Sequence, residues 1–426
     1  MTLAVGVEEE FHVLEVETGK LVPRAGDVLQ GLPKGRFTTE LLQSIVESNS
    51  DVHTTLDALW ADLIQSRARL GGSAAGHGLA VVAAGTVPLA DSGADRVTPD
   101  RRYRHMVSEY RRIADEQLIC GTHVHVDVPD RDTAVRAMCT ISPWVPVLLA
   151  LSASSPFWAG ADTGYASWRT MLWQRWPTAG PAGCFPDAAG YDTAVSELIA
   201  SGVVTDPGMI YYDLRPSDHQ PTLELRVCDS SPSAETVVLI AAIFRALVMR
   251  ATARVAAGGA PQCDGRHEWL RAATWRAARS GLEGDLVDPV SRRPAPAARV
   301  VRTMLTRLRP ELEECGDWAT VRELTEKAIA DGSAAYRLRR TAAGEDLLAC
   351  VDELIALTRG PGGRADLAQT VVRGPRPGCA AGPWSPSGAD PRPGARRPRV
   401  PVRTVRCGTH TEGGTPCAAT PHSPAA

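Results

Sequence analysis

Three stretches of the chain alternate between apolar and polar side chains with a period of two, which is typical of β-strands. They span residues 3–16, 118–128 and 222–229. In each stretch one face is mainly apolar and the other carries carboxylate, imidazole or guanidinium groups. Strands with two such faces favour an antiparallel sheet that packs helices on one side and opens to water or a ligand on the other.

Between these strands, apolar residues recur at helical spacing. The pattern predicts helices over residues 55–70, 101–116 and 234–256, and a mainly helical region with proline-rich interruptions over 281–357. This order of elements predicts an α+β fold with a dominant, mainly antiparallel sheet. The longest apolar runs are broken by proline, serine or arginine before they reach the roughly 20 residues of a membrane span, so we expect no membrane partner.

The composition changes near residue 365. From residue 374 to the end, 11 of 53 residues are proline, and valine is almost the only aliphatic residue larger than alanine. Such a segment buries too little apolar surface to offset the entropy of ordering it. We therefore expect residues 1–365 to form one domain and residues 366–426 to be a disordered tail rich in proline, arginine and glycine.

Charge narrows the possible functions. The chain has 46 basic and 49 acidic residues, a formal charge of −3, which argues against a nucleic-acid partner. The total hides two unlike regions, because residues 1–373 carry −8 and residues 374–426 carry +5. Only three basic residues are lysine, and none stands in a P-loop sequence, which excludes a P-loop nucleotide site. Any bound phosphate must therefore be held by arginine and metal ions.

The N-terminus and the cysteines indicate the compartment. Three consecutive acids at residues 8–10 stand where a signal peptide would have basic and apolar regions, so we expect no signal peptide. The ten cysteines include no C-x-x-C pair. We expect a cytoplasmic protein with reduced, mostly buried thiols.

Acidic and basic groups gather on the polar faces of the three predicted strands. They are Glu8 and Glu10, His123 and His125, and Glu224 with Arg226. Acids collected on one sheet face repel each other, and a divalent cation relieves the repulsion. Oxygen ligands with one imidazole suit Mg²⁺ or Mn²⁺ better than Zn²⁺, and Arg226 can meet an anion such as phosphate. For any single strand, the alternative to a metal or anion site is an ordinary polar face that is exposed to solvent.

Glu40 and Glu47 form a further candidate pair in an apolar context. On a helix, a spacing of seven returns both carboxylates to one face, whereas a strand or turn presents them differently. The sequence leaves open which of these holds.

Five stretches form a set of motifs when taken together. They are GVEEEF at 6–11, ICGTHVHV at 119–126, LELRV at 223–227, and the segments 155–180 and 332–359. The set resembles the glutamate–cysteine ligase type 2 family, which are bacterial ATP-dependent carboxylate–amine ligases. The resemblance covers about residues 3–360. It implies a glutamine-synthetase-like catalytic domain with a curved, mainly antiparallel sheet and helices packed on one face.

The resemblance also implies roles for individual residues. It implies two metal sites, one formed by Glu10, Glu40 and Glu47 and the other by Glu8, His123 and Glu224. It implies that Arg226 faces a phosphate. Arg169, in the segment 155–180, is our candidate for binding the substrate carboxylate or a phosphate, and the alternative is a surface arginine. We expect His12 and His125 to have supporting or structural roles.

The implied activity is the joining of a carboxylate to an amine with ATP and Mg²⁺ or Mn²⁺. ATP phosphorylates the carboxylate, and the amine then attacks the acyl phosphate. No nucleophilic side chain is needed, in agreement with the lack of Ser/His/Asp and Cys/His patterns. The expected partners are small molecules, namely ATP with glutamate and cysteine, which would give γ-glutamylcysteine, ADP and phosphate. Whether the protein is a homo-oligomer is left open.

Two alternatives remain at this point. The H-x-H pair of His123 and His125 also occurs in metal-dependent amidohydrolases, although the only later histidines before the tail are His219 and His267. A non-catalytic binding protein on the same fold is the second alternative.

Overall fold

The computed structural model describes residues 2–91, 95–259, 266–342 and 346–360. The predicted tail at 366–426 lies outside these residues, so the domain boundary at residue 365 stays a prediction.

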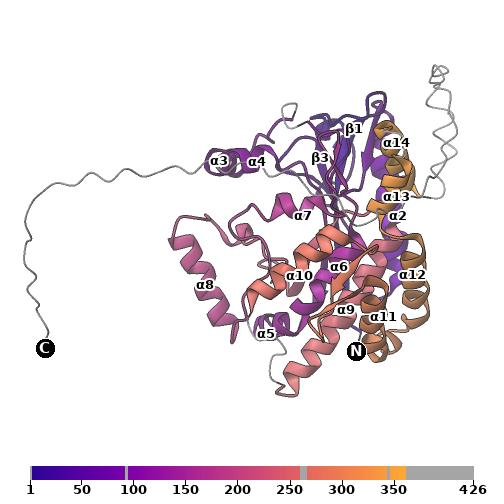
Figure 1. Ribbon diagram of the computed structural model, residues 1–426. Helices are drawn as coiled ribbons and strands as arrows, with labels where there is room; N and C mark the ends of the chain where they lie inside the picture. The colour runs from indigo at the N-terminus through magenta and orange to yellow at the C-terminus, as the bar shows by residue number, and fades with distance from the viewer. Residues whose placement is uncertain (1, 92–94, 260–265, 343–345, 361–426) are drawn as a thin grey trace, which may run out of the picture. The chain divides into compact units, whose positions relative to one another are not determined.

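The main sheet of the described fold has seven strands, of which β1 and β3 are labelled in Figure 1. Its strands follow the order β2-β3-β1-β5-β9-β8, with β4 also paired to β1, and all these pairs are antiparallel. The strands are β1 (Val5–Glu15), β2 (Phe37–Thr39), β3 (Ile45–Asn49), β4 (Leu79–Val82), β5 (Gly121–Asp127), β8 (Leu214–Pro216) and β9 (Thr222–Asp229). Two-stranded sheets are formed by β6 (Phe157–Trp158) with β7 (Ala161–Asp162), and by β10 (Asp285–Val287) with β11 (Pro294–Pro296). All three predicted strands are present, and the antiparallel prediction is confirmed.

Helices occupy most of the remaining described chain. They are α1 (Ala25–Leu29), α2 (Leu56–Ala75), α3 (Arg101–Tyr110), α4 (Arg112–Asp115), α5 (Arg131–Ile141), α6 (Val145–Ser152), α7 (Trp168–Trp173), α8 (Ala188–Ala200), α9 (Ala234–Ala256), α10 (His267–Ser280), α11 (Ala297–Glu314), α12 (Trp318–Asp331), α13 (Ala334–Thr341) and α14 (Leu347–Arg359), with 3₁₀ turns at Ser142–Trp144 and Pro207–Met209. The helix predicted over 234–256 coincides with α9. The one predicted over 101–116 is wrong as a single helix, because Arg111 adopts a φ of 53° and separates α3 from α4.

The core is organised around α9. This helix packs against β1 and β5 and is flanked by α11 and α12 (Figure 1). Arg245 interrupts its apolar sequence, but the side chain is buried and paired with Asp317, and its Nη1 donates to the carbonyl of Thr54 at 2.8 Å. A buried arginine with these partners is compatible with a helix that is apolar on nearly every side.

Two helical stretches, Arg131–Ser152 and Ala234–Ala256, have the length and hydropathy of a membrane span. The prediction that no apolar stretch reaches this length is therefore wrong, since α5, a 3₁₀ turn and α6 continue one another. Both stretches are largely buried inside the fold, 83% and 78% of the apolar window respectively. Packing in the core accounts for their hydropathy.

Cys139 on α5 and Cys184 form a disulfide, with their Cα atoms 5.5 Å apart. The prediction of reduced thiols is therefore wrong for these two cysteines. They are separated by 45 residues, and no local spacing motif marks the pair. Of the free cysteines in the described residues, Cys120, Cys228 and Cys350 are buried as predicted.

A buried ion pair joins β1 to α2. Alternation along β1 directs Glu9 to the face opposite Glu8 and Glu10. Arg67 on α2 binds the Glu9 carboxylate through Nη2 at 2.5 Å and Nε at 3.3 Å, and both side chains are 1% exposed. The same guanidinium donates to the carbonyls of Ser231 and Pro232 at 2.7 and 2.8 Å. Arg67 therefore links the strand that carries Glu8 and Glu10 to the turn before α9.

Replacing Arg67 with Met is expected to lower the free energy of unfolding by about 3–5 kcal/mol, because the Glu9 carboxylate stays buried without its counter-charge. Urea unfolding followed by circular dichroism measures the change. The double variant Arg67→Met/Glu9→Gln should recover part of the loss. Arg69→Met, on the exposed face of the same helix, should stay within about 0.5 kcal/mol of wild type. Equal stability of Arg67→Met and Arg69→Met would contradict the role given to the ion pair.

Candidate active site

Glu40 and Glu47 reach the sheet acids from a β-hairpin. In the pairing of β3 with β1, Glu47 lies opposite Glu10, so both side chains point to the same face. Glu40 directly follows β2, the other arm of the hairpin. Carboxylate oxygens of Glu10, Glu40 and Glu47 all lie within 4.8 Å of one another. The helical interpretation of this segment is therefore wrong, and the hairpin is what brings the two acids together.

None of the three carboxylates forms an ion pair with an arginine, lysine or histidine within the described part of the chain. Thr38 and Asn49 donate to Glu47 at 3.3 and 3.0 Å, and the backbone N–H of Gly121 donates to Glu10. Burial and the neighbouring carboxylates of Glu47 and Glu10 raise the pKa of Glu40 well above its ordinary value. Burial raises the pKa of Glu47 too, together with the charges of Glu8 and Glu10. Closely spaced carboxylates with unbalanced charge are the donor set that a hard divalent cation takes, so these residues fit Mg²⁺ or Mn²⁺.

A second group is formed by side chains from three neighbouring strands. Ligand atoms of Glu8 on β1, His123 on β5 and Glu224 on β9 lie within 4.8 Å of one another. Glu8 contacts His123 Nδ1 at 2.9 Å and His125 Nε2 at 3.2 Å. The structure thus brings together all six residues expected to bind metal, in the two sets of three that the resemblance implies. Their role as ligands stays a prediction.

The second group differs from the first because its charges are already balanced. One Glu224 oxygen accepts from Arg215 Nε at 2.8 Å, and the other pairs with Arg226. Burial would raise the pKa of Glu224, but the charges of Arg226 and Arg215 hold it well below the ordinary value. Burial would also raise the pKa of Glu8, but hydrogen bonds with His123 and His125 lower it well below its ordinary value. The donor set again fits a cation, which would share Glu224 with the two arginines.

A β-bulge places Arg226 beside these groups. In the pairing of β5 with β9, Thr122 lies opposite Cys228 and Val124 opposite Leu225, so Arg226 and Val227 together face the single residue His123. Strict alternation over residues 222–229 would place Cys228 on the same face as Glu224 and Arg226. That assignment is wrong, because the extra residue in the bulge reverses the alternation beyond it.

Arg169 is buried, with 2% of its surface exposed, so the surface alternative is wrong. Its guanidinium donates to the bulge carbonyls of Val227 and Arg226 at 3.2 and 3.4 Å, while its Nε has no acceptor among the described residues. It also stacks over Trp173 and lies so close to Gly121 that a Cβ there would be 2.3 Å from Nη2. With Glu10 and Glu40, Arg169 lines a cavity of about 40 Å³. A buried cation therefore stands at the edge of the carboxylate cluster.

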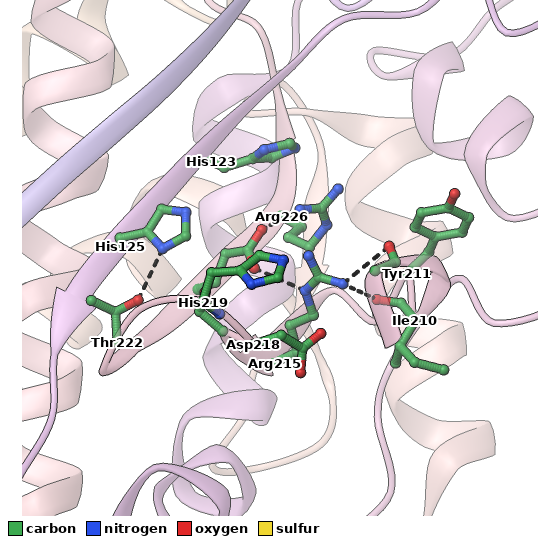
Figure 2. Close-up of polar contacts among 12 residues, drawn as sticks. His123, His125, Ile210, Tyr211, Arg215, Asp218, His219, Thr222 and Arg226 are labelled. Atoms are coloured by element: carbon green, nitrogen blue, oxygen red, sulfur yellow. Dashed lines mark hydrogen bonds and ion pairs between the residues drawn. The ribbon is translucent and has the colours of Figure 1, made fainter. Parts of the chain in front are cut away.

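The two remaining histidines are held by their surroundings. His125 lies between Glu8 and the hydroxyl of Thr222, which is 2.9 Å from Nδ1 (Figure 2). His12 is fully buried, and burial lowers its pKa to about 4. Neither His219 nor His267 belongs to a metal-holding group within the described residues. The further histidine ligands that the amidohydrolase alternative needs are thus missing from this part of the chain.

Sequence reasoning missed Arg215 and Asp229. Arg215 lies on β8, beside Arg226 in Figure 2, and its Nη1 donates to the carbonyl of Ile210 at 2.7 Å. The three residues of β8 are too few to show a strand period. Asp229 is fully buried and accepts from Ser155 and Ser167 at 2.7 Å each, which anchors the segment that carries Arg169. Its position at the end of a predicted strand was visible, but its partners were not.

Residues 4–353 match the sequence profile of glutamate–cysteine ligase family 2. The chain belongs to this family.

Close relatives support the assignment to glutamate–cysteine ligase family 2. The protein named "Putative glutamate--cysteine ligase 2-3" from Frankia alni is 54% identical over 354 residues, which are 83% of this chain and 41% of the relative. "Putative glutamate--cysteine ligase 2-2" from Mycolicibacterium smegmatis is 51% identical over 356 residues, 83% of this chain and 89% of the relative. The chain therefore spans less than half the length of the Frankia protein and most of the Mycolicibacterium one.

Solved structures share the family fold. A bifunctional glutathione synthetase from Pasteurella multocida matches with a TM-score of 0.65 at 15% identity, over 86% of this chain and 52% of that one. A glutamate–cysteine ligase from Francisella tularensis in complex with AMP matches with a TM-score of 0.63 at 11% identity, over 87% and 92%. These similarities confirm the predicted α+β, glutamine-synthetase-like fold class.

Proposed function

We propose that this family 2 protein is an ATP-dependent carboxylate–amine ligase that works through an acyl phosphate. Its proposed substrates are glutamate, cysteine and ATP, and its products are γ-glutamylcysteine, ADP and phosphate. The observation that carries the proposal is the half-buried cluster of Glu10, Glu40 and Glu47, whose carboxylates form no ion pair in the described chain, while Glu10 and Glu40 line a cavity with the buried Arg169. The family assignment and the names of the relatives support the substrate pair.

The two groups of acids are the proposed metal sites. With Mg²⁺ or Mn²⁺ bound, Glu10, Glu40 and Glu47 at one site and Glu8, His123 and Glu224 at the other would hold cations that neutralise the phosphate oxygens of ATP. The carboxylates on three strands and one turn, and the imidazole on a fourth strand, are held in place by the sheet itself. Such a rigid frame suits a reaction in which catalysis is mostly positioning and charge stabilisation.

Two arginines are the proposed phosphate and carboxylate ligands. Arg226 is tied to Glu224 through one nitrogen, and its Nε is buried without an acceptor among the described residues. Arg169 likewise keeps a free, buried Nε. Buried donors without acceptors are unfavourable unless a ligand supplies an oxygen. We assign Arg226 to the transferring phosphoryl group and Arg169 to the substrate carboxylate.

The reaction then needs no covalent intermediate on the protein. A carboxylate oxygen of glutamate attacks the γ-phosphorus of ATP, and the bond to ADP breaks. The amine nitrogen of cysteine attacks the carbonyl carbon, phosphate leaves, and the nitrogen loses a proton. Arginine side chains aimed at the phosphoryl oxygens stabilise the charge that moves from ATP to the acyl phosphate. A cytoplasmic location, with ATP and amino acids as the partners, belongs to the same proposal.

The test is ADP release by the purified full chain with Mg²⁺ and amino acids, offered singly and in pairs. The proposal expects release that requires both a carboxylate and an amine substrate and is greatest with glutamate and cysteine. Amide hydrolysis without ATP would indicate the amidohydrolase alternative. Nucleotide binding with no turnover for any pair would indicate a non-catalytic binding protein.

Gly121→Ala should weaken the use of the carboxylate substrate, because the new Cβ would displace the Arg169 guanidinium. Misplacing a substrate-positioning group by about 1 Å can lower the rate by about 10²-fold, so we expect kcat/KM to fall by about 10- to 100-fold. Steady-state kinetics with glutamate varied measure it, with the effect expected mainly in KM.

Gly6→Ala on the neighbouring strand is the matched control. A Cβ at Gly6 would meet nothing closer than Ser50 Oγ at 3.9 Å, so its kinetics should resemble those of wild type. Equal KM values for glutamate in the Gly121→Ala and Gly6→Ala variants would show that Arg169 does not bind the substrate carboxylate.

A further inference from the structure

A second, larger cavity lies on the other side of β1. Its volume is about 480 Å³, and its walls come from α2, α9, α12, α13 and α14. Arg67, which lines it, reaches Glu9 on the face of β1 opposite Glu8 and Glu10. None of the residues assigned to the ligase site lines this cavity. Its size is within the range of about 300–1,000 Å³ that is usual for small-molecule sites.

Much of the cavity wall is apolar. Trp60 and Ile64 of α2, Leu239 of α9, Leu324 of α12 and Leu357 of α14 all contribute side chains. These residues come from four helices, so the apolar lining does not form one flat patch. A concave apolar wall favours a ligand with a hydrocarbon or aromatic body.

One cation in the wall is without an acceptor. Arg67 is engaged by Glu9, and Lys327 is engaged by Glu235. Arg337 on α13 has no acceptor for its guanidinium among the described residues, and its Nε is buried. A buried guanidinium nitrogen without an acceptor, on a residue that lines a cavity, is suited to an anion.

The beginning of α9 also lines the cavity. Ser233, Ala234 and Thr236 line the cavity, and the Ser233 side chain does not cap the helix. A 23-residue helix places partial positive charge at its first turn. Glu235 of the same turn also lines the cavity, and its carboxylate is paired with Lys327. Asp331 also lines the cavity but is exposed to solvent. Arg337 and the first turn of α9 thus add polar groups to a wall that is largely apolar.

We propose that the cavity is a binding site for a small amphipathic anion, with an apolar body along Trp60 and Leu239 and a carboxylate bound by Arg337. The site is separate from the ligase centre and does not depend on the proposed function, because it shares no residue with it. The residue that connects the cavity to the ligase centre is Arg67. It lines the cavity and binds Glu9 on β1, the strand that also carries Glu8 and Glu10.

The test is isothermal titration of the purified full chain with decanoate and with decanol, which has the same chain length but no charge. We expect decanoate to bind at least about 10-fold more tightly than decanol, since a charge-assisted contact contributes about 1.5–3 kcal/mol. Equal affinity for the two, or no decanoate binding at millimolar concentration, would overturn the proposal.

Variants locate the site. Arg337→Met should weaken decanoate binding about 10-fold and leave decanol unchanged, whereas Arg340→Met, on the exposed part of the same helix, should change neither. Ala328→Trp should fill the cavity and block both ligands, with thermal unfolding used to confirm that the variant is folded. Arg67 is left intact, because its removal would unpair Glu9. Equal weakening by Arg337→Met and Arg340→Met would show general charge attraction and refute the site.

Discussion

Replacing Glu40 with Gln is expected to lower ligase activity by at least about 10²-fold, the scale on which loss of one charge-stabilising group acts. The same variant should lose Mn²⁺ binding at the carboxylate cluster, since one of three oxygen donors becomes a neutral amide. Isothermal titration with Mn²⁺ and steady-state kinetics measure the two effects.

Although Glu40→Gln should lower ligase activity, it should raise the stability of the metal-free protein. The pKa of Glu40 is raised by burial and by Glu47 and Glu10, so the folded state holds its proton more tightly than the unfolded chain does. This contribution to stability is present at low pH and is lost as the pH rises from the ordinary carboxylate range through the raised pKa. The Glu40→Gln variant has no carboxyl at this position to ionise, so it does not lose this stability as the pH rises. In EDTA its melting temperature should therefore exceed that of wild type by a margin that grows with pH.

Glu326→Gln is the matched control for this variant. Glu326 is an exposed carboxylate on α12 that pairs with Arg302, far in sequence from both groups of acids. It should leave Mn²⁺ binding and activity unchanged. If Glu40→Gln bound Mn²⁺ as wild type does, or were less stable than wild type in EDTA at pH 8, the cluster would not be a metal site of the kind proposed.

Arg226→Lys is expected to have a comparable or larger effect, lowering kcat by about 10²–10³-fold with a smaller change in KM. Lysine keeps the charge but lacks the planar fork that can hold Glu224 and a phosphoryl oxygen at once. The loss should be in kcat, because the proposed contact strengthens as charge moves onto the phosphoryl group.

Single-turnover and steady-state kinetics separate these parameters for Arg226→Lys. The control is Arg250→Lys on α9, where the arginine binds Glu311 near the surface. Its kinetics should match wild type. An Arg226→Lys enzyme with unchanged kcat and raised KM would place Arg226 in ground-state binding only.

The sequence predicted the central elements because they are long and regular. Strands β1 and β9 have 11 and 8 residues, and α9 has 23, so a period of 2 or 3.6 is visible in each. The strands β2, β3 and β8 have three to five residues and show no usable period. For the same reason the geometry of Glu40 and Glu47 could not be derived: a spacing of seven suits either a helix or a hairpin.

The details that shape the site come from pairing between distant strands. The bulge opposite His123 depends on how β9 pairs with β5, and it decides which side Cys228 faces. Arg169 is buried because Gly121, 48 positions earlier, leaves room for its guanidinium. Arg215 pairs with Glu224 across the edge of the sheet. Spacing within a single segment cannot show any of these contacts.

The central claim is that the chain activates a carboxylate by phosphorylation. The most direct test incubates the full chain with ATP, Mg²⁺, cysteine and glutamate labelled with ¹⁸O in the γ-carboxylate, followed by mass spectrometry of the inorganic phosphate. We expect one ¹⁸O atom in the phosphate for each amide formed, because the carboxylate oxygen that attacks ATP leaves with the phosphoryl group. Amide formation with unlabelled phosphate would contradict the acyl-phosphate mechanism.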